Sequence, residues 1–293
     1  MNEKSSNQER FKNYLRKIGS GEQTSQALTR QESADALELM LREEPSQIQI
    51  GAFMIAHRIR RPESQELAGM IDSYLKLGPK IYSGNPSHLP ICLGMPFDGR
   101  LTTSPIYPLT TLLLLNASQP IVLQGAGRLP VKYGITTQEL FQSLGLDLRN
   151  LTIETVQEGF IDHGLAFIFQ PDHFPLADCL IKYREDIGKR PPIASMELMW
   201  SAHQDEHLLI SGFVHPPTEK RHITTLEILG EKNFILINGL EGGIDIPTSR
   251  ISKATRAINK TIQELKINPR EYSCNEKESQ FNNLQKWSSQ SYA

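Results

Sequence analysis

The chain has 293 residues, of which 39% are hydrophobic and 22% are charged, as in an ordinary folded protein. Its 31 Lys and Arg residues against 33 Asp and Glu give a formal net charge of -2, so the whole-chain balance does not favour a nucleic-acid partner. No run of apolar residues is long enough for a membrane span, and the polar N-terminus does not resemble a signal peptide. The cysteines Cys92, Cys179 and Cys274 are odd in number and lack metal-ligand spacing. We therefore expect reduced thiols in a cytoplasmic protein.

The first part of the chain is predicted to be helical. Residues 1–27 form a polar lead-in with one short amphipathic piece at Phe11, Tyr14, Leu15 and Ile18, which we expect to be a helix. Thr29 and Glu32 have the spacing of a capping box, and apolar residues then recur at helical intervals. Breaks at Pro45 and Pro62 divide the region into three helices. Residues 28–78 are thus expected to form a small helical domain.

The rest of the chain has the pattern of an α/β domain. After a linker at 79–87, short continuous apolar runs alternate with helical segments over residues 88–270, which predicts a mainly parallel, buried central sheet. Residues 271–293 are polar, and we expect this tail to be disordered or weakly helical. The expected strands are 89–93, 120–124, 166–169, 207–213 and 234–238, and the expected helices are 108–115, 137–144, 174–187 and 222–229.

Several motifs resemble those of the anthranilate phosphoribosyltransferase family, the pentosyltransferases of tryptophan biosynthesis. The helical region, the segment Arg184 to Arg190 with its R-x-x-L-G-x-R pattern, and Gly242 to Asp245 carry this similarity over residues 28–270. The resemblance implies a glycosyltransferase fold that joins anthranilate to phosphoribosyl pyrophosphate with Mg²⁺, and a homodimer formed through the helical domain. The chain looks like a divergent member that lacks the family's C-terminal strand and helices.

The glycine loop of the family, G-T-G-G-D-G, is altered in this sequence. Gly94, Asp98 and Gly99 keep their places, but Met95, Pro96 and Phe97 replace the central residues. A pyrophosphate needs consecutive backbone N–H groups at close approach. Proline has no N–H, and phenylalanine fills the space of the phosphate. The alternative is a purely structural turn between a strand and a helix.

The other elements of the family's site are also incomplete. Gly125 stands where the family has a basic K-H-G-N-R element, with Lys132 nearby as a cation that could hold an anion. The family's acidic pair for Mg²⁺ is reduced to Asp245, because Ile246 follows it. Arg184 matches the family's arginine that contacts the aromatic acid. Arg184 and Arg190 could instead belong to a solvated helix face.

Gly94, Asp98, Gly99, Gly125, Lys132, Arg184 and Arg190 are therefore the candidate substrate-binding residues, with Asp245 as the candidate metal ligand. We interpret the histidines as scattered and expect neither a catalytic triad nor a zinc site. The sequence predicts a weakly active or inactive phosphoribosyltransferase-like protein, with Mg²⁺ only if it is active. A non-catalytic relative that binds nucleic acid and an inert scaffold or regulatory dimer remain as alternatives.

Overall fold

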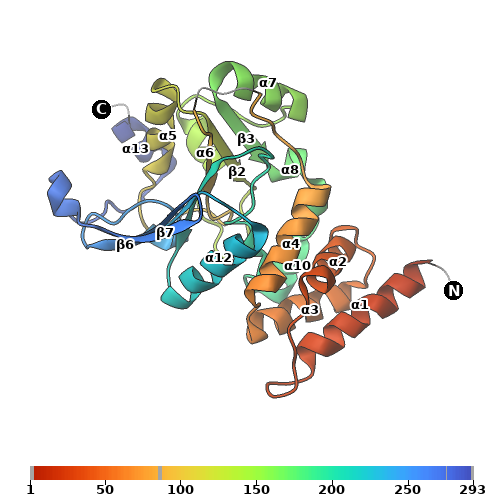
Figure 1. The fold of residues 1–293 in the computed structure, drawn as a ribbon. Coiled ribbons are helices and arrows are strands. Elements are labelled where there is room, and N and C mark those ends of the chain that lie inside the picture. The colour runs from red at the N-terminus through yellow and green to blue at the C-terminus, as the bar shows by residue number, and fades with distance from the viewer. Residues whose placement is uncertain (1–2, 85–87, 275, 292–293) are drawn as a thin grey trace.

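The structure is a computed structural model that describes residues 3–84, 88–274 and 276–291 (Figure 1). It contains a bundle of N-terminal helices beside a larger α/β domain, as the sequence predicts. No helix in these ranges is both long and apolar enough to cross a membrane.

The helical bundle consists of α1 (Glu3–Gly19), α2 (Arg30–Leu41), α3 (Gln47–Arg60) and α4 (Ser64–Leu77). Capping boxes begin α2 at Thr29 and α3 at Ser46, where each hydroxyl accepts a backbone N–H of the first turn. Helix α1 packs against α3, and the ring centroids of Phe11 and Phe53 are 5.1 Å apart. The amphipathic piece around Phe11 and Ile18 is thus a helix, as expected, and α1 extends it back to Glu3, into what we expected to be a loose lead-in.

A seven-stranded sheet forms the centre of the α/β domain in the order β3-β2-β1-β4-β5-β6-β7. The first five of these strands are parallel, and β6 and β7 join them as an antiparallel hairpin that the sequence did not predict. The strands are β1 (Ile91–Gly94), β2 (Ile121–Gly125), β3 (Leu165–Phe169), β4 (Leu208–Phe213), β5 (Phe234–Asn238), β6 (Ser252–Ile258) and β7 (Thr261–Ile267).

Successive side chains of the central strands point to opposite faces of the sheet. Cys92 of β1 and Leu209 of β4 belong to a core that includes α7 (Ile153–His163), α12 (Pro216–Leu229) and the helical bundle. Leu93 and Leu123 belong to a second core with α5 (Tyr107–Asn116) and α6 (Thr137–Ser143). The sheet is thus buried on both faces, which explains its continuous apolar strands.

The predicted helix 174–187 is divided in the structure into α9 (Pro175–Asp178) and α10 (Ile181–Ile187). Helix α10 contacts α3, so this segment does return to the helical bundle as the family resemblance implies. The remaining short elements are α8 (Gln170–His173), α11 (Ile193–Met196), η1 (Leu240–Gly242) and η2 (Pro269–Tyr272).

The tail is more ordered than we expected. It contains α13 (Leu284–Ser291), which packs on α6. Trp287 is 4% exposed in the second core and donates its indole N–H to the Pro105 carbonyl over 2.9 Å. Phe281 and Leu284 pack on the same core, and Phe281 donates its backbone N–H to the Thr102 carbonyl. A few apolar side chains therefore anchor this polar segment.

Candidate functional site

A cleft of about 550 Å³ lies where the helical bundle meets the carboxyl ends of the parallel strands. The end of α3, the segment before α11, the start of α12 and the loop after β5 line it. The strand order reverses direction between β1 and β4, and such switch points are where open α/β sheets bind ligands. The cleft is therefore the first place to look for a functional site.

Four arginines line this cleft: Arg58, Arg61, Arg190 and Arg221. Arg190 lies 3.4 Å from the Asp98 carboxylate. Within residues 3–84, 88–274 and 276–291, none of the other three forms an ion pair with a carboxylate. Burial and the neighbouring charge of Arg61 lower the pKa of Arg221. An anion entering the cleft would relieve this repulsion.

The altered glycine loop does not open into this cleft as a phosphate-binding surface. Every residue from 94 to 100 is buried, including Met95 and Phe97. A Cβ at Gly94 would lie 2.0 Å from the Leu198 carbonyl oxygen, so another backbone segment already covers that glycine. Gly99 has a φ of +74°, which only glycine adopts without strain, and it turns the chain into a bridge between Arg100 and Ile135.

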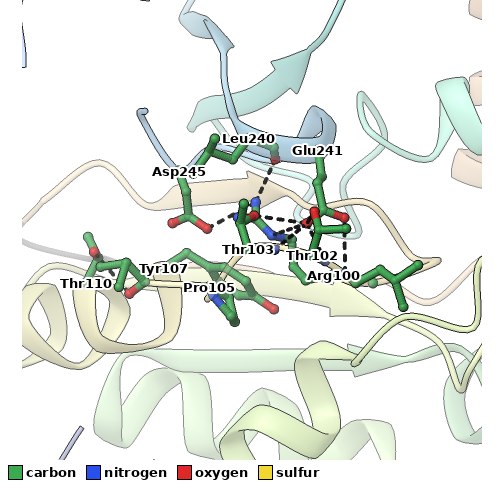
Figure 2. Close-up of polar contacts among 12 residues, drawn as sticks. Arg100, Thr102, Thr103, Pro105, Tyr107, Thr110, Leu240, Glu241 and Asp245 are labelled. Atoms are coloured by element: carbon green, nitrogen blue, oxygen red, sulfur yellow. Dashed lines mark hydrogen bonds and ion pairs between the residues drawn. The ribbon is translucent and has the colours of Figure 1, made fainter. Parts of the chain in front are cut away.

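The next turn of the chain offers backbone N–H groups that are already occupied by an internal carboxylate (Figure 2). Glu241, from η1, accepts the N–H groups of Leu101, Thr102 and Thr103 over 2.9 to 3.1 Å, together with both threonine hydroxyls. Lys132 lies 2.8 Å from the other side of the same carboxylate. Burial opposes ionisation, but Lys132 and the threonine N–H groups hold the pKa of Glu241 well below its usual range.

Arg100 lies fully buried beside Glu241 and Asp245 (Figure 2). One of its guanidinium nitrogens donates to the Leu240 carbonyl over 2.6 Å and lies 3.4 Å from the Asp245 carboxylate. Burial raises the pKa of Asp245, while Arg100 and the N–H groups at the start of α5 oppose that shift. Asp245 thus already faces a fixed cation, and Ile246 offers no second carboxylate. These residues do not fit a Mg²⁺ ion held by an acidic pair.

The remaining predicted site residues are dispersed. Gly125 ends β2 and is buried next to Phe167. Arg184 is 3% exposed and forms an ion pair with the buried Glu197, so it lies in the interior and not on an open anion surface. The structure brings Asp98, Gly99, Lys132 and Arg190 together around the buried loop, because Lys132 also donates to the Gly99 carbonyl.

Comparisons with known proteins agree with this architecture. A model of the glycosyl transferase family, helical bundle domain, matches residues 12–78. An anthranilate phosphoribosyltransferase of Caldicellulosiruptor saccharolyticus is 22% identical over 236 residues, which are 80% of this chain and 68% of that protein. The chain is thus similar to anthranilate phosphoribosyltransferases over most of its length, and its helical bundle matches that of the glycosyl transferase family. An uncharacterised protein of Aquifex aeolicus is 26% identical over 220 residues, 75% of this chain. Our chain spans 65% of that relative's length.

Solved structures share the fold of this chain. Anthranilate phosphoribosyltransferase from Saccharomyces cerevisiae, in complex with PRPP and Mg, superposes with a TM-score of 0.77 at 14% identity. The alignment covers 96% of this chain and 80% of the yeast chain.

Reasoning from the sequence missed three features of this chain. Arg100 follows directly after Gly99, and its position beside the loop was the available signal. Glu241 was not among the candidate site residues. The interpretation of the histidines as scattered overlooked His203 and His207, which have the H-x-x-x-H spacing and lie close to Cys92.

Proposed function

We propose that this protein binds phosphate-bearing polymers, namely nucleic acids, and has little or no phosphoribosyltransferase activity. The observation that carries the proposal is a group of three arginines, Arg58, Arg61 and Arg221, that line one cleft and have no carboxylate partner among the described residues. Like charges held together without carboxylates favour binding of an anion.

The argument against phosphoribosyl transfer rests on the loss of donors. Transfer of this kind depends on groups that stabilise the departing diphosphate. In this chain Pro96 has no N–H, Phe97 is buried, and Glu241 occupies the N–H groups of residues 101–103. A second anion at that position would also be repelled by the Glu241 carboxylate.

The argument for nucleic acid rests on the kind of anion that spaced arginines recognise. Arginine forms bidentate contacts with phosphate oxygens, and several arginines along a cleft can follow successive phosphates. The net charge of -2 means that the attraction is local. We therefore infer contacts to the phosphate backbone with little dependence on base sequence, and a strong dependence on salt.

Binding of labelled single-stranded and double-stranded DNA, followed by fluorescence anisotropy at two salt concentrations, tests this proposal. With about three phosphates neutralised, the logarithm of affinity should fall with the logarithm of salt with a slope of about -2 to -3. Replacing both Arg61 and Arg221 by alanine should weaken binding at least about tenfold. The control is Arg149→Ala, an exposed arginine outside the cleft that pairs with Asp147.

Absence of binding at low salt would remove the nucleic-acid function. Binding that is insensitive to salt, or equal in the cleft variant and the control, would remove the arginine cleft as its site. The homodimer through the helical bundle stays a separate prediction, which measurement of molecular mass in solution would test.

A further inference from the structure

A second cavity, of about 380 Å³, lies beside the amino ends of β4 and β5. The arginine cleft lies at the other ends of these strands, so the proposed function does not use this cavity. His203 and His207 line the cavity, and Cys92 of β1 lies next to them. Cys92 and His203 are buried, and the His207 side chain is 10% exposed. Burying a thiol and imidazole groups costs free energy unless they find partners, so this cluster calls for a partner.

The spacing of the three ligand atoms approaches that of a tetrahedral metal site. Nitrogen ligands about 2.0 to 2.1 Å from Zn²⁺ are about 3.3 Å from each other, and a thiolate sulfur is about 3.6 Å from each nitrogen. The Nδ1 atoms of His203 and His207 are 3.4 Å apart. One ligand atom from each of the three residues lies within 4.8 Å of the others. Closing the larger separations takes a side-chain movement of about 1 Å.

The other ring nitrogens have the partners that metal-bound histidines need. The Nε2 of His203 is hydrogen-bonded to the Ser83 hydroxyl, which fixes the orientation of that ring. The Nε2 of His207 lies 3.9 Å from the Glu231 carboxylate, too far for a hydrogen bond but close enough for electrostatic attraction. The competing explanation is hydrogen bonding, because both Nδ1 atoms also lie within 3.1 Å of the Asp205 carbonyl oxygen. A hydrogen bond from one imidazole N–H to that carbonyl would explain the orientation of one histidine ring. It would not explain why the Cys92 thiol lies beside both rings.

We propose that Cys92, His203 and His207 bind one Zn²⁺ ion, with the fourth coordination position facing the cavity. A thiolate and two neutral imidazoles form a ligand set that suits Zn²⁺ and Co²⁺ better than Mg²⁺ or Ca²⁺. On binding, the Cys92 thiol releases its proton to solvent and the sulfur becomes a ligand. This site is independent of the arginine cleft and of any phosphoribosyl chemistry.

Titration of the untagged, chelator-treated full chain with Co²⁺ tests the proposal, since tetrahedral Co²⁺ reports a thiolate ligand by a charge-transfer band. We expect one Co²⁺ per chain, displaced by Zn²⁺. Cys92→Ser should abolish the charge-transfer band, and His207→Gln should weaken affinity at least about tenfold. The matched controls, Cys274→Ser and His163→Gln, change exposed residues and should bind as the wild type does.

Circular dichroism of each variant separates loss of the site from loss of the fold. If Cys92→Ser does not fold, His207→Gln decides the question, because His207 lies at the cavity edge. Failure of the wild type to bind Co²⁺ or Zn²⁺ would overturn the proposal. Equal affinity in the site variants and the controls would also overturn it, and would leave the histidines as hydrogen-bonding partners of Asp205.

Discussion

At the scale of single residues, the cations of this protein differ in whether a carboxylate accompanies them. Arg100, Lys132 and Arg184 each face a buried or half-buried carboxylate. In the part of the chain that the structure describes, Arg58, Arg61 and Arg221 have no such partner. The first three are therefore expected to contribute to folding, and the second three to binding. Predictions on individual residues can separate these two roles.

Glu241→Ala should destabilise the protein by about 2 to 3 kcal/mol, because it leaves three backbone N–H groups without their acceptor and Lys132 without its carboxylate. The pKa of Glu241 is depressed in the folded state. Its contribution is therefore full above the ordinary carboxyl pKa and is lost as the pH falls toward the folded value. Urea unfolding at neutral and acidic pH measures both effects. The exposed Glu158→Ala is the control, and an equal effect of the two variants would refute the role of Glu241.

Arg184→Ala should cost about 3 to 5 kcal/mol, since it leaves the Glu197 carboxylate buried without its partner. The double variant Arg184→Met and Glu197→Leu should lose much less stability. Neither the single variant nor the double variant should have an altered affinity for DNA, provided that it remains folded. Loss of DNA binding in the stable double variant would instead restore Arg184 as a ligand contact.

His222 should also make stability depend on pH, but because burial disfavours the charged form of its side chain, whereas the contacts of Glu241 favour the charged form. Burial, and then the charge of Arg221, lower the pKa of its imidazole from 6.5 to about 4. As the pH falls below about 6.5, the unfolded chain takes up a proton while the folded chain does not, so stability declines until the pH reaches about 4. Between about pH 7.5 and pH 5 the loss should be about 2 kcal/mol.

Urea unfolding of His222→Gln at these two pH values measures this contribution by comparison with the wild type. The variant should show a smaller loss of stability on acidification. His163→Gln, at an exposed position, should keep the wild-type dependence. An unchanged dependence in His222→Gln would contradict the account of His222.

At the scale of elements, the parallel strands could be predicted to within one or two residues. Their apolar runs are continuous because both faces of the sheet are buried. The β6–β7 hairpin was missed because its strands lie at the edge, where Lys253, Arg256 and Lys266 interrupt the apolar pattern. The break between α9 and α10 was also missed, because the residues at the break are Cys179 and Leu180 and neither is a Pro or Gly.

Helix α13 gives a prediction at this scale. Trp287→Ala should lower stability by about 3 kcal/mol and release the helix from α6, because the indole fills the second core and bonds Pro105. Chemical denaturation followed by circular dichroism measures the change. Tyr272→Ala, at a residue that is 70% exposed, should be nearly neutral. If Trp287→Ala has no effect on stability, the tail does not pack on the second core, and the disorder expected from its composition would be the better description.

At the scale of the whole molecule, the two-part architecture followed from the sequence, and the location of the site followed only in part. The change of pattern from helical periodicity to buried strands indicated both regions. Residues that meet through tertiary structure, such as Arg61 with Arg221 or Glu241 with Thr102, lie far apart in the chain. No spacing rule connects them, so the occupied N–H groups and the arginine cleft needed the three-dimensional structure.

The central claim is the proposal that this chain has little or no phosphoribosyltransferase activity, because residues 94–100 are buried and Glu241 occupies the N–H groups of residues 101–103. Anthranilate-dependent consumption of phosphoribosyl pyrophosphate by the purified protein, in the presence of Mg²⁺, tests this claim most directly, with an intact family member as the positive control. The account predicts turnover at least about a thousandfold below the control, since removal of even one donor to a developing anion costs about that much. Turnover comparable with the intact enzyme would contradict it.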